Sequence, residues 1–266
     1  MHDAIYHFVE IPDPLHDSIR THGKLIISYS GGVDSAFLLR AAAEVLGPDG
    51  VRPIMIVNEA VPEVQRRAAL ENAEGAGVEV QVITVPIDSI EGFRGNPHDR
   101  CARCKRAMYG SLLAHSGGWP VADGATATDV GKGRIGLTVA DELGIVHPLA
   151  EAALSDIDVR RLSRELDLPF AGMPSTTCLA TRFLEGEDLD PALLRSIERS
   201  EEFIMDLGFP VVRVRLWGGP PLVQVAPGDV PRLMGPTVME AVRKKLEGEG
   251  FDGMEIDPAG YSESPD

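Results

Sequence analysis

A glycine-rich turn near the N-terminus is the feature that most constrains the fold of this chain. The stretch "SYSGGVDSAFLLR", residues 28–40, follows the apolar run "KLII" and leads into apolar residues at helical spacing. The pattern predicts a short buried strand over 24–29 and a helix that starts near Ser35 and ends before Gly47-Pro48. The loop between them is therefore a strand-to-helix turn that opens onto a helix N-terminus.

The same turn carries several groups that suit a bound anion. Gly31 and Gly32 let the backbone approach a ligand closely, and its N–H groups together with the helix dipole favour a phosphate. Ser30 and Ser35 add hydroxyls, and Asp34 is placed to hold a Mg²⁺ ion that accompanies the phosphates. The alternative is a tight connection without a ligand. The turn is not a Walker A loop, because the Gly-Lys-Ser/Thr ending of that motif is absent from the sequence.

The string "SGGVDS", residues 30–35, resembles the pyrophosphatase loop (PP-loop) of the ATP pyrophosphatase superfamily. The resemblance implies that the loop holds the β- and γ-phosphates of ATP, that a substrate attacks the α-phosphate, and that pyrophosphate leaves. Arg134, in the turn before a predicted helix, either contacts the nucleotide or caps surface acids. The residues expected to bind ATP are Ser30, Gly31, Gly32, Val33, Asp34, Ser35 and Arg134, with Asp34 as the Mg²⁺ ligand.

Strands and helices alternate through the first two thirds of the chain. This alternation favours an α/β fold with a doubly wound parallel sheet, which the superfamily resemblance makes adenine nucleotide alpha-hydrolase-like. Strands are expected at 52–57, 78–85, 119–122 and 145–149, and helices at 62–75, 103–115, 134–143 and 155–167.

The pattern changes after "AGMPSTTC", and we place a domain boundary near residue 175. A smaller C-terminal α/β domain is predicted from a helix at 191–207, the strand "VVRVRLW", a strand near 222–226, a helix at 237–247 and "GMEI". We expect an ATP-binding domain over 1–174, a second domain over 175–256 and a disordered tail over 257–266.

Charge and hydropathy limit the partners. The 266 residues include 41 acidic and 25 basic side chains, a formal charge of −16, which disfavours nucleic acid as a partner. No run is apolar and long enough for a bilayer, and the N-terminus lacks a leader pattern, so we expect a cytoplasmic protein without a membrane partner. "GKGRIG", residues 131–136, matches the dinucleotide-binding pattern but does not directly follow a strand, which argues against a nicotinamide cofactor.

The chain has three cysteines, two of them in "RCARCK" and one in "STTCLATR". An odd count in a cytoplasmic chain argues against a disulfide scaffold. Cys101 and Cys104 fit a redox dithiol, a structural zinc site completed by His98 or His115, or a site for an iron–sulfur cluster held by three thiolates. The redox interpretation leaves Cys178 without a role.

Cys178 is either a buried apolar residue or a reactive thiol. Its small polar neighbours and Arg182 form a polar, electropositive setting, which would favour the thiolate. Arg213 and Arg215 alternate along a predicted strand, so both point to one face, and two guanidinium groups there suit a phosphate monoester. The alternative for this pair is a solvated strand face.

Several motifs together resemble the ATP-dependent sulfur transferases of the LarE type over roughly residues 20 to 250. They are "SGGVDS", "CARCK", "DGATATDVGKGRIG", "HPLAEAALS", "PSTTCLATRF" and "GFPVVRVRLW", in that order. The resemblance implies adenylation of a carboxylate of pyridinium-3,5-biscarboxylic acid mononucleotide and its replacement by a thiocarboxylate. The product serves the nickel-pincer cofactor of lactate racemase.

By this resemblance, Cys178 lies at the sulfur-transfer site, and Arg213 and Arg215 bind the substrate phosphate. Arg182 is also expected to bind that phosphate. Two sulfur sources are known in the family. The cysteine either gives up its own sulfur and becomes dehydroalanine, or three cysteines bind a [4Fe–4S] cluster whose open iron carries a hydrosulfide. The presence of Cys101 and Cys104 favours the cluster, with Cys178 as the third ligand.

The chain also departs from the family pattern. Gly172-Met173-Pro174 stands where an Asp-Lys-Pro is usual, and Pro221-Leu222-Val223-Gln224 where Ala-Arg-Ile-Glu is usual. These changes affect the identity of the substrate more than the chemistry. The alternatives to sulfur transfer to a small molecule are tRNA thiolation, an amide-forming ATP-pyrophosphatase ligase, and a nucleotide-binding sensor. We also expect a homo-oligomer.

Overall fold

The computed structural model describes residues 11–133, 135–172 and 176–261. Arg134, Met173-Pro174 and the boundary expected near residue 175 therefore lie outside the described residues. The chain forms two compact units. Unit 1 comprises Met1–Val57, Gln65–Val85 and Cys101–Ser175, and unit 2 comprises Asn58–Val64, Pro86–Arg100 and Thr176–Asp266. Two early segments thus belong to unit 2, whereas the domains expected from the sequence are contiguous.

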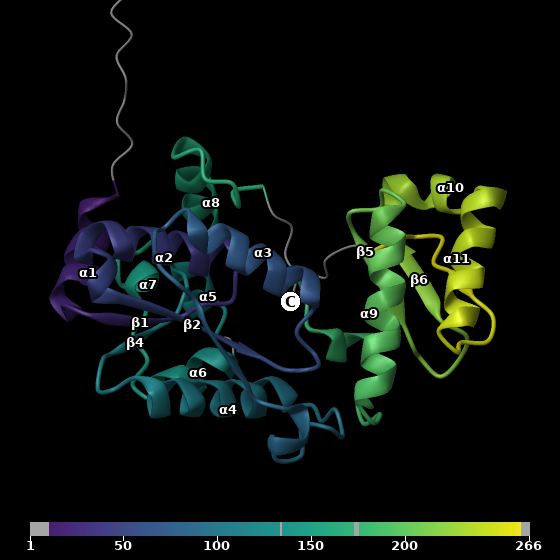
Figure 1. Ribbon diagram of the computed structural model, residues 1–266, viewed down its shortest axis with the longest axis horizontal. Helices are drawn as coiled ribbons and strands as arrows, with labels where there is room; N and C mark the ends of the chain where they lie inside the picture. The colour runs from purple at the N-terminus through teal and green to yellow at the C-terminus, as the bar shows by residue number, and fades with distance from the viewer. Residues whose placement is uncertain (1–10, 134, 173–175, 262–266) are drawn as a thin grey trace, which may run out of the picture. The chain divides into compact units, whose positions relative to one another are not determined.

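The sheet of unit 1 is parallel throughout the described residues (Figure 1). Its four strands run in the order β3-β2-β1-β4. Their bounds are β1 Leu25–Ser28, β2 Val51–Val57, β3 Gln81–Thr84 and β4 Val121–Ala122. Leu25–Ile27 of β1 and residues 53–57 of β2 are continuous buried apolar runs, because helices cover both faces of the sheet. The predicted α/β fold with a doubly wound parallel sheet is confirmed.

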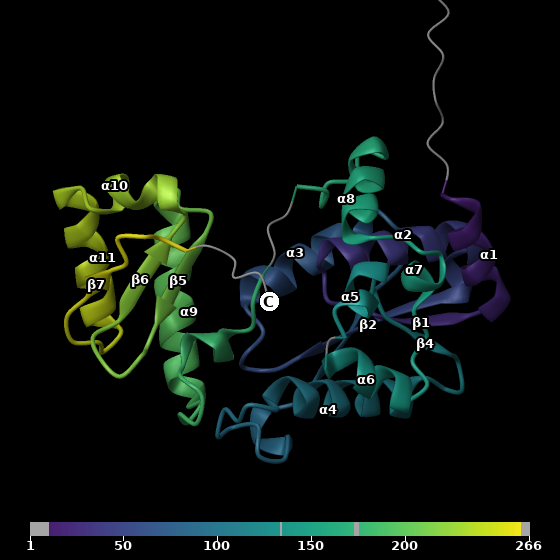
Figure 2. The same cartoon turned by 180° about the vertical axis from the view of Figure 1, so that it is seen from behind.

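Helices cover both faces of this sheet, as the two opposite views agree (Figures 1 and 2). One side has α1 Asp13–His22, α2 Val33–Leu46, α3 Glu63–Glu74 and α8 Asp156–Glu165. The other side has α4 Arg100–His115 and α6 Ile135–Glu142. There, Ile26 and Ile54 of the sheet pack with Tyr109 and Leu112 of α4 and with Val139 of α6. This core sets α2 and α4 on opposite sides of β1.

The strand expected at 145–149 is wrong. Only Val146 bridges to the sheet, beside Ala122, and a short helix, α7 Pro148–Glu151, follows at once. Pro148 has no N–H to donate to a strand ladder, and its fixed φ suits the first turn of a helix, so the chain leaves the sheet there.

The helix α5, Ala127–Gly131, was not predicted from the sequence, although Thr126 and Asp129 form the capping box that begins it.

Unit 2 contains a mixed sheet. Its strands β5 Val212–Arg215, β6 Leu222–Val225 and β7 Glu255–Ile256 lie in the order β5-β6-β7, with β5 and β6 antiparallel and β6 and β7 parallel. The helices of this part are α9 Pro191–Asp206, α10 Val230–Leu233 and α11 Pro236–Gly248. Val212 and Val214 are fully buried and pair with Val225 and Val223, so one face of the β5–β6 pair is apolar. The opposite face carries Arg213, Arg215 and Gln224.

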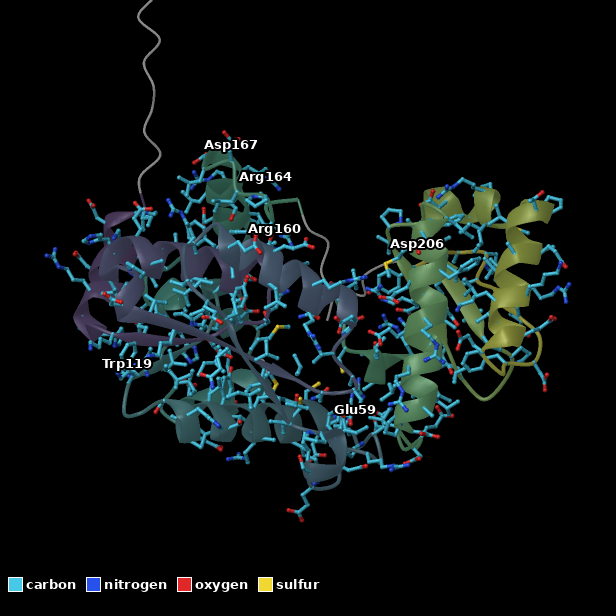
Figure 3. The ribbon with its side chains drawn as sticks, viewed as in Figure 1. Glu59, Trp119, Arg160, Arg164, Asp167 and Asp206 are labelled. Carbon is cyan, nitrogen blue, oxygen red and sulfur yellow. The ribbon has the colours of Figure 1, made fainter. Side chains whose placement is uncertain are left out.

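The two early segments are fastened to the later part of unit 2 by hydrogen bonds. The Leu179 N–H donates to the Ala60 carbonyl over 2.9 Å, and Asn96 Nδ2 donates to the Leu184 carbonyl over 2.7 Å. Glu59, labelled in Figure 3, accepts from the Ile87 N–H over 2.9 Å and so joins the segments to each other. These segments follow β2 and β3 directly along the chain.

Residues 257–261 lie in the segment expected to be disordered, yet they follow a defined, hydrogen-bonded path. The Asp257 N–H donates to the Val223 carbonyl over 3.0 Å, and the Tyr261 N–H donates to the Val225 carbonyl over 2.7 Å. Residues 262–266 lie outside the described part of the chain. No helix within the described ranges is long and apolar enough to cross a membrane.

Candidate functional site

The predicted phosphate loop connects β1 to α2 and is fastened internally by its serines. Ser35 Oγ donates to the Gly32 carbonyl over 3.1 Å and lies 3.0 Å from Ser30 Oγ. The Ser30 N–H in turn donates to Ser35 Oγ over 3.2 Å. The two hydroxyls therefore hold the loop closed around the first turn of α2, which begins at Val33.

Gly31 allows this loop to lie against α3. Its φ is +76°, and a Cβ at this position would lie 2.3 Å from the Cβ of Ala69. Gln65 Nε2 donates to the Ser30 carbonyl over 2.9 Å, and the Tyr29 hydroxyl donates to the Ala69 carbonyl over 2.8 Å. Both the conformation and the close approach require glycine at position 31.

A second close approach brings the loop after β4 to the same helix end. A Cβ at Gly124 would lie 2.8 Å from the Ser35 nitrogen. The N-cap residue of α2, Gly32, has no side chain to accept hydrogen bonds from the first turn. Asp34 adds its carboxylate to that turn. The turn therefore combines backbone donors and the positive helix end with one carboxylate, which suits a metal-bound phosphate.

The residue before Gly124 lies at the centre of a buried polar network that the sequence did not reveal. Asp123 Oδ1 lies 2.7 Å from His147 Nδ1, and Asp123 Oδ2 accepts from the Tyr109 hydroxyl over 2.5 Å. His147 Nε2 lies 3.2 Å from Asp141 Oδ1. The Ala125 N–H also donates to Asp123, over 3.0 Å, so the network holds the loop that approaches α2.

Charge within this network shifts two pKa values. Burial alone would raise the pKa of Asp123, but the hydrogen bonds and charges of His147, Tyr109 and Lys105 lower it below its ordinary value of 3.8. The hydrogen bond and charge of Asp123, with a smaller effect from Asp141, raise the pKa of His147 above 6.5. Both shifts favour the charged forms, the Asp123 carboxylate and the His147 imidazolium.

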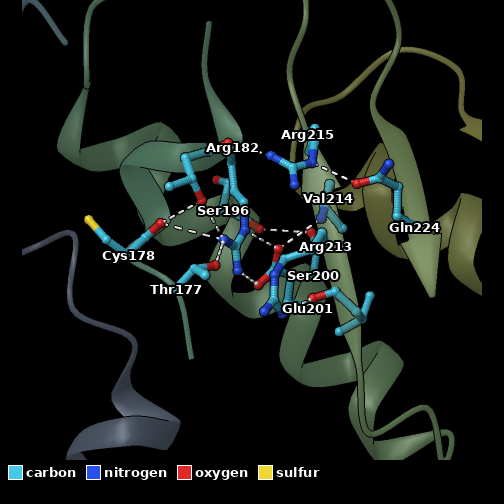
Figure 4. Close-up of polar contacts among 12 residues, drawn as sticks. Thr177, Cys178, Arg182, Ser196, Ser200, Glu201, Arg213, Val214, Arg215 and Gln224 are labelled. Carbon is cyan, nitrogen blue, oxygen red and sulfur yellow. Dashed lines mark hydrogen bonds and ion pairs between the residues drawn. The ribbon is translucent and has the colours of Figure 1, made fainter. Parts of the chain in front are cut away.

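In unit 2, Arg182 forms a buried ion pair with Glu201 of α9 (Figure 4). The Arg182 side chain is only 1% exposed, and its Nε and Nη2 donate to the two Glu201 oxygens over 2.7 and 2.9 Å. Its Nη1 donates to Thr177 Oγ1 and Thr181 Oγ1. Glu201 also accepts from the Val214 N–H, so this pair connects the turn after Cys178 to β5. A direct contact of Arg182 with substrate stays a prediction.

Arg213 and Arg215 lie on one face of β5, beside Arg182 (Figure 4). Arg215 donates from Nε to Gln224 Oε1 over 2.6 Å and from Nη1 to the Thr181 carbonyl over 2.7 Å. Arg213 donates from Nη1 to the Val212 carbonyl over 2.7 Å, and its Nε is buried without a partner among the described residues. Burial, and next the charge of Arg182, lower the pKa of Arg213 and Arg215. Such a site gains stability from an added anion.

Cys178 is exposed and immediately precedes the short 3-10 helix Leu179–Arg182. Arg182 Nη1 reaches the carbonyl oxygen of Cys178 over 3.4 Å, and Figure 4 shows the sulfur directed away from the arginines. Arg182 thus contacts the backbone of Cys178, and its effect on the thiol stays a prediction.

Cys101 and Cys104 lie on the first two turns of α4 in unit 1, the first exposed and the second half-buried. Cys178 belongs to unit 2. All three cysteines lie among the described residues and none is in a disulfide. Over the described ranges, no three His, Cys, Asp or Glu side chains are grouped to hold a metal ion. The cluster and zinc interpretations therefore stay predictions, although accessible thiols are the donors that an iron–sulfur cluster takes.

No protein-family model matches the chain. Curated proteins do match over most of its length. The pyridinium-3,5-bisthiocarboxylic acid mononucleotide synthase of Lactiplantibacillus plantarum is 27% identical over 241 residues, which cover 90% of this chain and 87% of that protein. The resemblance to the LarE-type sulfur transferases is confirmed. An uncharacterised protein of Synechocystis is 29% identical over 90% of both chains, and one of Methanocaldococcus jannaschii is 27% identical over 86% of both.

Two parts of the site escaped prediction despite a signal in the sequence. Glu201 falls in the apolar stripe of α9 with Leu194, Ile197 and Ile204, and an acid at such a position indicates a buried cationic partner. Asp123 directly follows β4, at the edge of a parallel sheet where ligands bind. Tyr261, whose ring lies 4.6 Å from the Arg213 guanidinium, carried no signal within its short polar tail.

Proposed function

We propose that this chain is an ATP-dependent sulfur transferase that activates a carboxylate as an acyl-adenylate and converts it to a thiocarboxylate. We infer that the substrate is pyridinium-3,5-biscarboxylic acid mononucleotide and that the product serves a nickel-pincer cofactor. The observation that carries this proposal is the similarity, over 90% of the chain, to a synthase named for the corresponding bisthiocarboxylic acid mononucleotide. That relative gives no support to tRNA thiolation or to an amide-forming ligase.

The activation step uses the loop between β1 and α2. The backbone N–H groups at the first turn of α2 bind the β- and γ-phosphates of ATP, and Asp34 holds the accompanying Mg²⁺. An oxygen of the substrate carboxylate attacks the α-phosphorus, the bond from that phosphorus to the bridging oxygen breaks, and pyrophosphate leaves. The glycines at positions 31 and 124 support this step, because both allow backbone contact around the loop.

The arginine pair of β5 binds the phosphate of the mononucleotide. Arg213 has a buried, unpartnered Nε, and Arg215 lies two residues along on the same face. Each charge-assisted hydrogen bond is worth about 1.5–3 kcal/mol, so we expect Arg213→Ala to raise the Kd of the substrate at least about tenfold. Arg232→Ala is the matched control, because Arg232 is exposed and donates to the Gly208 carbonyl. An unchanged Kd in Arg213→Ala contradicts this assignment.

We propose that the sulfur comes from an iron–sulfur cluster held by Cys101, Cys104 and Cys178. The support is the donor set, because these are the three cysteines of the chain and thiolates are the ligands of such clusters. When bound, the cluster would supply a hydrosulfide that replaces AMP on the activated carboxylate. The alternative source is Cys178 itself, which would become dehydroalanine.

Product analysis tests the function. Protein purified without oxygen is incubated with MgATP and the pyridinium dicarboxylate mononucleotide, and nucleotides and acids are separated by liquid chromatography and mass spectrometry. We expect AMP and pyrophosphate together with a substrate in which one oxygen is replaced by sulfur. ADP and orthophosphate as the sole nucleotide products, or AMP formation without any thiocarboxylate, contradict the proposal.

A further inference from the structure

The C-terminal strap, which we define as Asp257–Tyr261, is built into the sheet of unit 2. It continues from β7 along β6 through the two backbone hydrogen bonds to Val223 and Val225. Gly260 has a φ of +71°, and a Cβ there would lie 2.7 Å from the Val225 carbonyl oxygen. Only glycine fits this turn, so the path of the strap is specified by the sequence.

The strap brings two side chains to the arginine face of β5. The ring centroid of Tyr261 lies 4.6 Å from Arg213 Cζ and 5.9 Å from Arg215 Cζ. Asp257 Oδ2 accepts from Gln224 Nε2 over 2.7 Å, and Gln224 Oε1 accepts from Arg215 Nε over 2.6 Å. Both arginines are thus fixed, directly or through Gln224, by residues of the strap.

Arg213 and Arg215 have no ion-pair partner of their own within the described residues, although the charge of Glu201 acts on both. Arg182 is neutralised by Glu201, but no carboxylate oxygen of the described chain lies within 4.0 Å of the nitrogens of Arg213 or Arg215. Arg213 is 8% exposed and its buried Nε has no hydrogen-bond partner there. A buried guanidinium with an unused donor is costly unless a ligand completes it.

We propose that Tyr261 is a positioning residue of the phosphate site, holding Arg213 so that its N–H groups meet the phosphate edge-on. A guanidinium has all its donors in its plane, so an aromatic ring against its face fixes that plane and leaves the donors available. The ring also excludes water from one side of the guanidinium. This inference rests on the proposed function, since it assumes that Arg213 binds the substrate phosphate.

Binding of ribose 5-phosphate, a simple phosphate monoester, tests the inference without requiring turnover. Titration calorimetry on the full chain compares the natural protein with Tyr261→Leu and Tyr261→Phe. We expect Tyr261→Leu to raise the Kd roughly five- to thirtyfold, as loss of a cation–π contact predicts, and Tyr261→Phe to change it less than about twofold. Trp119→Leu is the control, because Trp119 stacks on Arg52 in unit 1, with 4.0 Å between Cζ and the ring centroid.

In turnover, the same Tyr261→Leu protein should show a raised KM for the mononucleotide with kcat unchanged, because the ring acts on binding alone. A merely structural role would instead lower the melting temperature and leave the Kd unchanged, which overturns the inference. Equal Kd values in the Phe and Leu variants also overturn it, since the hydroxyl would then matter rather than the ring.

The variant Arg213→Ala separates this inference from the proposed function. If Arg213→Ala abolishes ribose 5-phosphate binding while Tyr261→Leu does not change it, only the role of Tyr261 is wrong. If Arg213→Ala binds as the natural protein does, or the natural protein does not bind ribose 5-phosphate, then the arginine face is not the phosphate site and both proposals fail there.

Discussion

At the scale of single residues, the buried ion pair of Arg182 and Glu201 has a larger effect on stability than any surface pair. Both side chains are nearly inaccessible to water, at 1% and 7% exposure, and Glu201 also accepts the Val214 N–H. Removing one partner would leave the other charge buried and uncompensated.

We therefore expect Glu201→Ala to lower the free energy of unfolding by about 3–5 kcal/mol, measured by urea denaturation. Glu165→Ala is the control, because Glu165 pairs with Arg161 on the exposed surface of α8, where water and salt screen the interaction and the loss should be much smaller. Similar losses in the two variants would mean that burial does not set the strength of the Arg182 pair.

A second residue-scale prediction concerns Gly31. The substitution Gly31→Ala places a Cβ 2.3 Å from that of Ala69 and strains a φ of +76°. Gly23→Ala strains a similar φ of +70° but has no atom within 4 Å of the new Cβ. We expect Gly31→Ala to be less stable than Gly23→Ala by at least about 1 kcal/mol, and to lose pyrophosphate release, because α3 and the phosphate loop must separate. Equal unfolding energies would contradict this packing.

At the scale of elements, the Asp123–His147 pair connects the turn after β4 to the start of α7, and its stability depends on pH. The folded pKa of His147 is raised above 6.5, so its contribution is fully present below that pH and is lost as the pH rises through the folded value. The folded pKa of Asp123 is lowered, so its contribution is present above 3.8 and is lost as the pH falls through the folded value.

We expect the melting temperature to fall as the pH rises above 6.5, and His147→Gln to reduce that fall. Thermal unfolding followed by circular dichroism from about pH 5 to 9 measures the melting temperatures of both proteins. The control is His115→Gln, which removes an exposed imidazole at the end of α4. A fall of the same size in His147→Gln would assign the pH dependence to another group.

The sequence predicted best those elements whose signals are local. The strand, glycine turn and helix around Ser30–Ser35 were correct because apolar periodicity and turn residues are adjacent there. The alternation in "VRVR" correctly placed Arg213 and Arg215 on one face. The strand at 145–149 failed because an apolar run does not by itself distinguish a strand from a helix beginning at Pro148.

The remainder of the site depends on contacts between residues distant in the chain. Glu201 meets Arg182 and the Val214 backbone, and Tyr261 meets Arg213, across separations that no local pattern encodes. The tail that contains Tyr261 is polar and short, so its composition predicted disorder, whereas two backbone hydrogen bonds and Gly260 give it a defined path.

At the scale of the whole molecule, the three cysteines distinguish the two sulfur sources. If they hold one cluster, protein purified without oxygen should contain about four irons and should turn over repeatedly with added sulfide. Each of Cys101→Ser, Cys104→Ser and Cys178→Ser should lose iron and sulfur transfer together. Iron assay, labile-sulfide assay and intact mass measure these outcomes.

Iron-free protein that transfers sulfur once and then lacks one H₂S in mass at Cys178 would establish the alternative source. In that case Cys101→Ser and Cys104→Ser should transfer sulfur as the natural protein does. The two interpretations thus differ in which cysteines matter as well as in the metal.

The exchange of segments between the two units determines the order in which they are completed during synthesis. The chain passes from one unit to the other at residues 57–58, 64–65, 85–86, 100–101 and 175–176. All segments of unit 1 have been synthesised once residue 175 has left the ribosome. Asn58–Val64 and Pro86–Arg100 of unit 2 form their hydrogen bonds only after Leu179 and Leu184 have been synthesised. A gene fragment that encodes residues 176–266 alone therefore lacks two segments of its own unit. A ribosome that stalls at residue 175 leaves both segments without the backbone groups to which they hydrogen-bond.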